Sequence, residues 1–323
     1  MYNNLQKHKS QIFFIAKLII ITGAFYIISH KIIENKILYT SDFYSFIKSN
    51  IFYNYLNLFL LLLFTIANWF FEITKWQTLV SFFKKITFSD AAKQSLASLT
   101  ASLITPNRIG EYGAKAIFYP KQNRKKILIL NFLGNISQML VTTFFGIIGL
   151  FYLSGYLNFK LNISIVTIAL ITSLIIFFTL LMFKLDFLKN WIKKFKNYII
   201  SIPLGIQFSN LIFSFIRYLI FSNQFYFLLN IFKIDLDYFT ALSLITSTYF
   251  IASLIPGFVV FDFIIKGSVA VSLFGFFQVN EIAILTVTTI MWLLNFALPS
   301  ILGSYFVLIF KIPPPIKIPI HQK

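Results

Sequence analysis

Residues 101–111 read ASLITPNRIGE, and a lysine follows at position 115. Residues 252–257 read ASLIPG, and an aspartate and a lysine follow at positions 262 and 266. Each copy has a short apolar stretch, a helix-breaking proline, an acidic residue and a lysine four residues after the acid. Pro106 and Pro256 lie 150 residues apart, one near the middle of each half of the chain. Broken helices at matching places in two halves are typical of the binding region of transporters.

The overall composition is that of an integral membrane protein. Hydrophobic residues make up 58% of the 323 residues and charged residues 12%, whereas soluble domains carry roughly 25% charged residues. The mean hydropathy is +0.80, and several apolar stretches reach the roughly 20 residues that a helix needs to cross a bilayer. We therefore expect an all-α fold, a polytopic transmembrane bundle that forms a single integral membrane domain, with halves at about 1–160 and 161–310 and a tail at 311–323.

The residue types exclude several function classes. The net charge of +18 comes from basic residues in short segments between apolar runs, which indicates cytoplasmic loops and contact with anionic lipid headgroups rather than nucleic acid. The chain has no cysteine, and its three histidines fall outside the apolar runs, which argues against thiolate or histidine metal sites. No nucleophile set is evident, so we expect no cofactor, no metal and no enzymatic activity.

Apolar runs predict six full crossings, and the basic segments orient them. The first run shows no cleavage site and is interpreted as a retained transmembrane helix. Basic segments at 75–93, 121–126 and 184–196 indicate the cytoplasmic side, so both termini are predicted to lie in the cytoplasm and the protein in the cytoplasmic membrane. The predicted crossings are at about 11–29, 51–76, 127–153, 161–183, 199–232 (or 203–232) and 282–310.

This orientation works only if the two broken segments do not cross the membrane. The segment around Pro106 then enters and leaves on the cytoplasmic side. The segment at about 238–277, which contains Pro256, enters and leaves on the outer side, beside Asp235 and Asp237. Six spans plus two re-entrant segments result, in two halves of opposite orientation, which is the inverted repeat of many transporters. Eight plain crossings, with each broken segment as one kinked span, are the alternative.

Pro106 predicts a helix start that suits an anion. Proline removes a backbone donor and disfavours helix in the residue before it, so a new helix is expected with Thr105 as N-cap and Pro106 at its first position. The free N–H groups of such a start suit a phosphate or a carboxylate, and Arg108 adds a bidentate partner. The alternative is a proline kink with an arginine that extends to interfacial headgroups.

Charged residues within the broken segments are further candidates. Glu111 and Lys115, like Asp262 and Lys266, are spaced to meet on one helix face. Each charge at the bilayer centre costs roughly 2.5–3.5 kcal/mol, so ion pairing alone is a sufficient reason for the spacing. Pairing and binding are compatible, because a pair can open to receive a charged headgroup.

Arg217 lies in the middle of an apolar run with no acid nearby in the sequence. An intramembrane arginine needs a partner, and the candidates are Glu72, Glu111 and Asp262. Two polar stripes at helical spacing either line a pathway or hold helices together by hydrogen bonds. The stripes consist of Gln207, Asn210, Ser214, Arg217 and Gln224, and of Asn131, Asn135 and Gln138.

Residues 105–111, TPNRIGE, resemble the Thr-Pro-Gly-Arg-x-Gly-Glu signature of the lysylphosphatidylglycerol synthase transmembrane region, a flippase-like family. Lys115 matches the basic residue that often follows the glutamate in that family. Residues 256–262 look like the family's later Pro-Gly-Gly-x-Gly-x-x-Glu region, although phenylalanine and valine stand where glycines are usual and Asp262 replaces the glutamate. The length and the two-half layout fit the family across most of the chain.

The resemblance implies a protein that translocates or exports lipids or lipid-linked anionic molecules. The best-known relatives carry a soluble aminoacyl-transfer domain, whereas this chain ends about a dozen residues after its last predicted helix, so lysyl transfer is not expected. The alternative function is that of a non-transporting membrane partner of a lipid- or polysaccharide-modifying enzyme. The predicted substrate-binding residues are Thr105, Pro106, Arg108, Gly110, Glu111, Lys115, Asn135, Gln138, Arg217, Pro256, Gly257, Asp262 and Lys266.

Overall fold

The computed structural model describes most of the chain from residue 54 onward. The predicted crossings at about 11–29 and 161–183 lie wholly or largely outside the described residues, as does the tail after residue 311. Helices joined by loops make up the described part, and no β-strand occurs in it. The described stretches are 54–103, 105, 108–156, 186–255 and 259–311, with isolated positions before residue 54.

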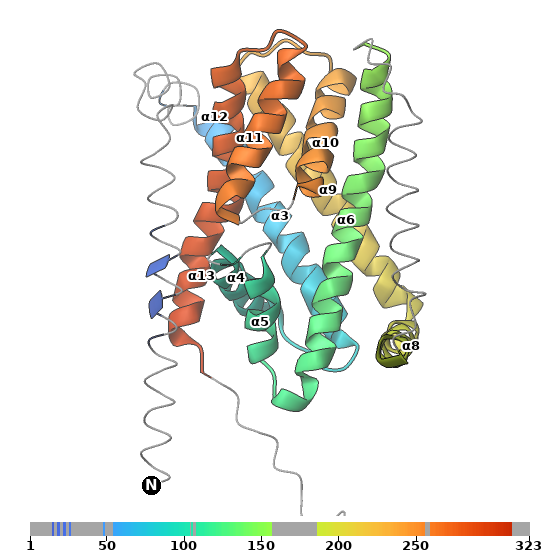
Figure 1. Ribbon diagram of the computed structural model, residues 1–323. Coiled ribbons are helices and arrows are strands. Elements are labelled where there is room, and N and C mark those ends of the chain that lie inside the picture. Colours follow the sequence, from blue (N-terminus) through green and yellow to red (C-terminus); the bar gives the residue numbers. More distant parts are fainter. Residues whose placement is uncertain are drawn as a thin grey trace, which may run out of the picture.

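Within the described stretches, four helices are long and apolar enough to cross a membrane, and they run along the bundle in Figure 1. They correspond to four of the six predicted crossings, so the all-α class and four helices of membrane-spanning length are confirmed. One turn of π-helix interrupts the last of the four. The bounds are Tyr55–Ser81 (α3), Arg124–Ser154 (α6, after a 3₁₀ turn at Lys121–Asn123), Leu204–Ile231 (α9), and Glu281–Trp292 (α12), Leu293–Ala297 (η4) and Leu298–Ile309 (α13).

The segments around the two prolines are each broken into a pair of shorter helices, as predicted. α4 (Phe88–Leu103) and α5 (Ile109–Ile117) pack against each other, and so do α10 (Tyr238–Leu254) and α11 (Val259–Gly275). In Figure 1 the α4–α5 hairpin lies in the lower half of the bundle and the α10–α11 hairpin in the upper half. The two hairpins therefore lie at opposite ends of the bundle.

Each hairpin packs against a long helix from the other half of the chain. α4 packs against α13, α10 packs against α6, and α3 and α9 pack against each other. Two glycines permit the closest approaches. A Cβ at Gly303 would meet the carbonyl of Leu96, and a Cβ at Gly149 would meet the side chain of Thr246. Small residues at such contacts let the backbones of membrane helices approach closely, so the two halves are interlocked.

Buried apolar side chains form two main clusters, and buried polar side chains of α3 lie between them. One cluster includes Leu61 of α3 together with side chains of α9 to α12. The other includes Trp76 and Leu79 of α3 together with side chains of α4, α5 and α6. Asn68 and Glu72 lie on α3 between these clusters, and both are buried. Two buried polar side chains of α3 therefore lie between the two apolar clusters.

Lys75 is not part of a cytoplasmic loop, and that prediction is wrong. Helix α3 continues to Ser81, and only 3% of the Lys75 side chain is exposed. Its Nζ lies 2.7 Å from Glu72 Oε2. A lysine near the end of an apolar run looks like a loop charge in the sequence, but its carboxylate partner three residues earlier keeps it inside the bundle.

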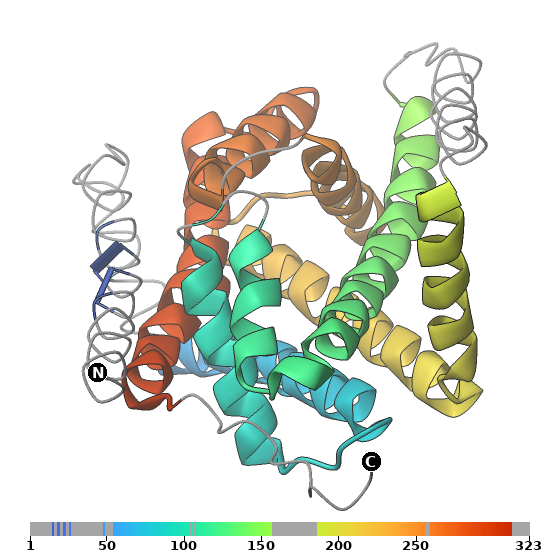
Figure 2. The same cartoon turned by 60° about the horizontal axis from the view of Figure 1, so that its bottom comes forward.

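The basic segment at 184–196 is mostly helical rather than a loop. It forms most of α8 (Asp186–Ser201), which lies at the base of the bundle across the direction of the long helices (Figures 1 and 2). Phe195 and Tyr198 pack on Phe132 and Phe82, with ring centroids 5.7 Å and 5.6 Å apart. Lys193 and Lys196 are exposed. A basic amphipathic helix in this position is suited to the membrane interface.

Candidate functional site

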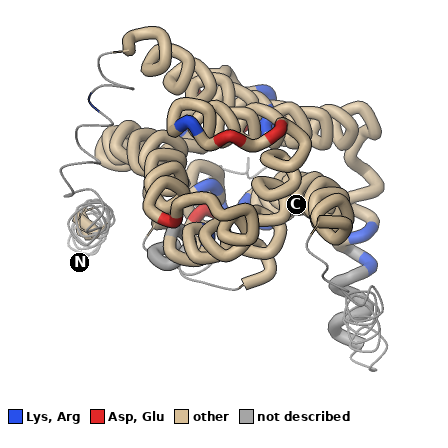
Figure 3. Tube along the Cα trace, turned by 90° about the horizontal axis from the view of Figure 1, so that it is seen from above, with Lys and Arg blue, Asp and Glu red and all other residues tan. Residues whose placement is uncertain are grey.

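A cavity of about 360 Å³ lies at the level of the two helix breaks. Side chains from both hairpins, from α3, α6 and α9, and from η4 line it. Seen from above, basic positions lie inside the ring of helices as well as on its rim (Figure 3). The described lining has four cationic side chains and two carboxylates, which leaves a net charge of +2. These six residues are Glu72, Arg108, Glu111, Lys115, Arg217 and Lys266.

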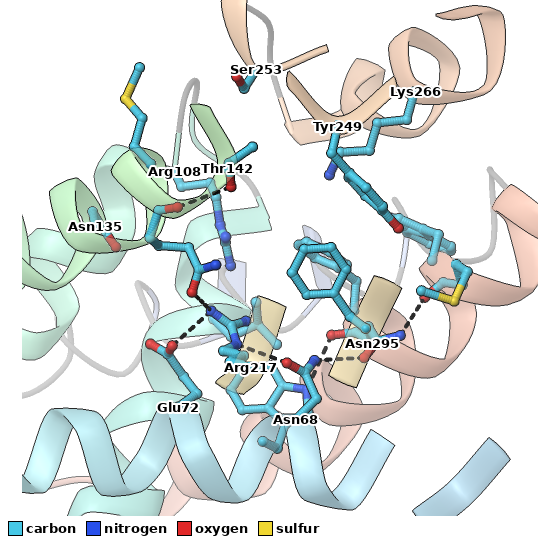
Figure 4. A pocket seen from close by; sticks show the side chains of 18 of the residues that line it. Asn68, Glu72, Arg108, Asn135, Thr142, Arg217, Tyr249, Ser253, Lys266 and Asn295 are labelled. Carbon is cyan, nitrogen blue, oxygen red and sulfur yellow. Dashed lines mark hydrogen bonds and ion pairs between the residues drawn. The ribbon is translucent and has the colours of Figure 1, made fainter. Parts of the chain in front are cut away.

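The first break holds Arg108 in a left-handed backbone conformation, with φ at 58°. Helix α5 begins at Ile109, so the predicted helix start at Pro106 is wrong. The N-cap is Arg108 rather than the predicted Thr105, although Thr105 Oγ1 accepts a hydrogen bond from the N–H of Gly110, in the first turn of α5, at 2.8 Å. A Cβ at Gly110 would lie 2.7 Å from that oxygen, so this tight turn needs glycine. The turn delays the helix start and points Arg108 toward the cavity (Figure 4).

Glu111 and Lys115 form the predicted ion pair, with Lys115 Nζ 2.8 Å from Glu111 Oε1. The same Nζ donates a hydrogen bond to Asn131 Oδ1 at 2.7 Å and lies 4.3 Å from the ring centroid of Trp76. Only 3% of the Lys115 side chain is exposed. Lys115 is therefore fully engaged by its neighbours and neutralises Glu111.

Arg108 has weaker contacts than the other arginine of the cavity. Its Nε lies 4.0 Å from Glu111 Oε2, which is beyond hydrogen-bond distance. This nitrogen is buried, and no hydrogen-bond partner for it occurs among the described residues. The guanidinium carbon lies 5.1 Å from the ring centroid of Phe296, and 39% of the side chain is exposed. Arg108 is thus the cavity cation that is best placed to take an added anion.

Arg217 has the acidic partner that its position predicted. Its Nη1 lies 2.8 Å from Glu72 Oε2, and its Nε donates to Asn68 Oδ1 at 2.9 Å, as Figure 4 shows. A longer contact of 3.5 Å joins Nη1 to Gln138 Oε1. Because Lys75 holds the same oxygen of Glu72, one carboxylate serves two cations.

Asn295 extends this network and was not predicted from the sequence. Its Oδ1 accepts from Asn68 at 2.7 Å, its Nδ2 donates to Gln224 Oε1 at 2.9 Å, and its carbonyl accepts from Trp69 Nε1 at 3.2 Å. It lies in the π-helical turn η4, next to Phe296. Such turns frequently occur at functional sites. The available signal was a single asparagine inside the apolar run at 282–310.

The predicted polar stripes divide between the cavity and the helix contacts. Asn135 and Gln138 line the cavity, and Asn135 Nδ2 donates to the hydroxyl of Tyr112 at 2.9 Å. Asn210 instead donates to Ser137 Oγ at 2.6 Å, which joins α9 to α6. Some residues of the stripes therefore line the cavity and others join helices, while a pathway along the stripes stays a prediction.

The second break contributes Lys266, which lines the cavity from α11. Its Nζ lies 5.4 Å from the ring centroid of Phe296 and 5.8 Å from that of Tyr249. Tyr249 and Ser253 of α10 also line the cavity and point toward it in Figure 4. Pro256, Gly257 and the side chain of Asp262 lie outside the described part of the chain, so the predicted Asp262–Lys266 pair stays a prediction.

The arrangement suits the binding of an anion with an apolar portion. Four cations and six aromatic rings are among the lining residues, and the described residues contain no group of three histidine, cysteine, aspartate or glutamate side chains that would hold a metal. Comparisons of the chain with protein-family models, with curated proteins and with solved structures give no match. The resemblance at residues 105–111 therefore stays a prediction.

Proposed function

We propose that the protein moves an anionic lipid, or an anionic molecule linked to a lipid, across the cytoplasmic membrane through this cavity. In this proposal it is a member of the flippase-like family that residues 105–111 resemble, and it acts as a transporter rather than an enzyme.

One observation supports the proposal most strongly. Arg108 follows the first helix break and Lys266 the second, and the two lie on opposite hairpins of the chain, yet both line one cavity. Backbone interrupted at membrane depth is tolerated inside protein or beside a water-filled cavity. Transporter sites form where such breaks meet near the bilayer midplane.

The proposed membrane arrangement follows from the positions of the hairpins. The α4–α5 hairpin enters from the cytoplasmic end and the α10–α11 hairpin from the outer end, so that six crossings and two re-entrant hairpins form an inverted repeat. Both chain ends then lie in the cytoplasm. The positions of the two hairpins in opposite halves of the bundle (Figure 1) support this arrangement, and so does their reciprocal packing on α6 and α13.

The proposed roles of the charged residues differ. Arg108 and Lys266 contact the headgroup. Lys115 and Glu111 keep the α5 side of the cavity polar and neutral, since they are paired at 2.8 Å. Arg217 lines the route on the α9 side, where Glu72 balances its charge. Apolar side chains of the lining, such as Phe221 and Met139, contact the upper part of the lipid tail.

Reconstitution into vesicles tests the proposal. Purified protein is expected to move a fluorescent phosphatidylglycerol between leaflets, measured by chemical quenching of the outer-leaflet label. Arg108→Ala and Glu111→Gln are expected to slow the movement about tenfold or more, because each removes a charge-assisted contact. Lys93→Ala is the control, since Lys93 is an exposed lysine of α4 whose Nζ lies 3.6 Å from Asp90.

Wild-type rates in both cavity variants would contradict the proposed function. Absence of movement by the wild-type protein, together with co-purification of a lipid- or polysaccharide-modifying enzyme, would favour the alternative role as a non-transporting partner.

A further inference from the structure

We propose that the cavity opens sideways into the hydrocarbon core of the membrane, and that an acyl chain of the bound lipid stays in this opening while the anionic headgroup reaches Arg108. The opening lies at residues 138–142 of α6, a stretch that we call the window. This inference rests on the proposed function, because it assigns a contact for the apolar part of the transported molecule. The substrate is then a lipid that enters from the bilayer rather than an anion that enters from water.

The first hairpin reaches α6 at the window. Lys115 of α5 donates a hydrogen bond to Asn131 of α6, and the hydroxyl of Tyr112 accepts one from Asn135. The two helices therefore run antiparallel, in steps of about one turn on each. One further turn brings the start of α5 beside about residue 139 of α6.

The second hairpin reaches the same stretch from the other end of the bundle. A Cβ at Gly149 would meet the side chain of Thr246, and a Cβ at Gly146 would meet that of Phe250, so α10 also runs antiparallel to α6. One further turn brings the end of α10, at Leu254, beside about residue 142 of α6. The two helix breaks therefore face one short stretch of α6 from opposite directions.

The window lies halfway along a helix that is long and apolar enough to cross a membrane. Helix α6 runs from Arg124 to Ser154, and Met139 is its central residue. The hydrocarbon core of a bilayer is about 30 Å thick and needs roughly 20 residues of helix, so the central residue of α6 lies near the bilayer midplane. At that depth the surroundings of an exposed side chain are acyl chains.

Polar lining residues and exposed apolar residues alternate at the rim of the window. In α6, at the start of α5 and at the end of α10, a polar residue that lines the cavity is followed at once by an apolar residue, more than half of which is exposed. Met139 itself lines the cavity as well, and its flexible side chain suits an acyl chain. The three pairs are Arg108 and Ile109, Gln138 and Met139, and Ser253 and Leu254.

The wall of the cavity on the α3 side consists of buried polar side chains. Asn68, Glu72 and Asn295 belong to this wall, and less than a tenth of each is exposed. Figure 4 shows Asn68 and Glu72 on the α3 side, whereas Thr142 and Ser253 lie on the opposite side. A lipid at the window therefore has polar partners on the inside and an apolar contact on the outside. Its headgroup is able to enter while its chains stay in the bilayer.

Single cysteines test the inference, because the chain has no cysteine of its own. A bimane fluorophore is attached to Met139→Cys in vesicles, and its quenching is measured with brominated phosphatidylglycerol or with a diacylglycerol that has the same brominated chains. Half-maximal quenching is expected at about tenfold lower content of phosphatidylglycerol, because Arg108 adds a charged contact to the phosphate. Arg108→Gln in the labelled protein is expected to remove this preference.

Phe144→Cys is the matched control. Phe144 is an exposed aromatic residue of α6 that is not among the described lining of the cavity, so its label is expected to be quenched equally by the two lipids. Thr142→Cys, at the other end of the window, serves if Met139→Cys does not fold. Glycerophosphoglycerol, the same headgroup without acyl chains, is expected not to relieve the quenching at position 139.

The outcomes separate the inference from the proposed function. Equal quenching by the two lipids at position 139 would overturn the inference. Relief of quenching by glycerophosphoglycerol as effective as that by unbrominated phosphatidylglycerol would also overturn it, since the acyl chain would then contribute nothing. If phosphatidylglycerol is still moved in an Arg108-dependent way in either case, the proposed function stands and the molecule enters by another route. An Arg108-dependent preference at position 139 without movement of phosphatidylglycerol would instead overturn the proposed function.

Discussion

Two groups of charged side chains in this protein differ in their burial and in the kind of contact that the structure gives them. Glu72, Lys75 and Arg217, on α3 and α9, are joined at 2.7 Å and 2.8 Å. Arg108 and Lys266, near the two helix breaks, lie over an aromatic ring at 5.1 Å and 5.4 Å. The first group has short partners among the described residues, and Arg108 of the second has none shorter than 4.0 Å.

The difference indicates separate roles for charges that look alike in the sequence. A buried ionic network whose members are all paired contributes to a unique arrangement of helices but binds nothing further. A cation that is held by a ring, with part of its surface in a cavity, is able to exchange its contacts for a ligand. We therefore expect substitutions in the first group to change stability and substitutions in the second to change transport.

Glu72→Gln is expected to have the largest effect. It leaves Lys75 and Arg217 buried without a carboxylate, and removal of one partner from a buried ionic group costs about 3–5 kcal/mol. Thermal unfolding in detergent measures the loss. Asp90→Asn is the matched control, because its partner Lys93 is 3.6 Å away and exposed, and such surface pairs contribute roughly 0–1 kcal/mol. Equal losses in the two variants would remove the distinction between the two groups.

Arg108→Gly separates stability from transport at the first break. Glycine adopts the left-handed conformation of this position, where φ is 58°, without the cost that arginine has. We expect the stability to rise by about 0.5–1 kcal/mol, while transport falls about tenfold or more because the headgroup loses a charged contact. Unfolding in detergent and vesicle transport measure the two quantities.

Lys233→Gly is the control for that variant. Lys233 has a φ of 54° in the loop after α9 and is not among the residues that line the cavity, so glycine there is expected to raise the stability and leave transport unchanged. Loss of transport in Lys233→Gly would mean that relief of backbone strain alone lowers transport, and the loss in Arg108→Gly would then not identify the arginine side chain as the cause.

Phe296→Leu is expected to have a smaller effect, confined to the second group. Leucine keeps an apolar side chain in η4 but removes the ring near Arg108 and Lys266. A cation–π contact is worth roughly 0.5–2 kcal/mol, which corresponds to a several-fold loss of lipid affinity. Phe144→Leu, on the exposed face of α6, is the control. Unchanged affinity in Phe296→Leu would indicate that the ring does not position the cations.

The sequence predicted the parts of this site where a single residue would destabilise an apolar helix unless the structure accommodated it. A proline inside an apolar run must break a helix. One helix ends at Leu103 and the next begins at Ile109, and likewise one ends at Leu254 and the next begins at Val259. An arginine in the middle of an apolar helix must find a carboxylate, and Arg217 finds Glu72. The pair Glu111–Lys115 followed from helical spacing alone.

The parts that were missed or misplaced depend on particular side-chain contacts that the sequence pattern did not specify. Asn295 meets Asn68 across more than two hundred residues of sequence, and no local pattern signals that meeting. Lys75 was assigned to a loop because charge density at the end of an apolar run normally marks one. The helix start at Ile109 rather than Pro106 depends on the hydrogen bond between Thr105 and Gly110, which requires the turn to be known.

Asp237→Asn has the smallest expected effect and shows which property makes Glu72 important. Asp237 caps α10 and accepts a hydrogen bond from the Thr240 N–H at 3.0 Å, so it is satisfied, but it is exposed to solvent. Hydrogen bonds from the side chain and backbone of Thr240 hold its pKa below the ordinary value. Because the pKa of Asp237 is lowered in the folded state, its ionised carboxylate stabilises the fold at pH values above the unfolded-state pKa of about 3.9. This contribution is lost as the pH falls through the folded-state pKa.

The wild-type protein is therefore expected to be slightly more stable than Asp237→Asn at pH 7, and the difference is expected to disappear on acidification below pH of about 4. Asparagine is itself a good N-cap, so the helix start survives and the difference isolates the charge. Unfolding midpoints of the two proteins across this pH range measure it. If Asp237→Asn lost as much stability at pH 7 as Glu72→Gln does, the hydrogen bonds and ion pairs of a carboxylate would by themselves explain its contribution to stability, whether or not it is buried. If Asp237→Asn loses little stability, the large effect of Glu72→Gln is due to the burial of the cations that Glu72 pairs with on α3 and α9.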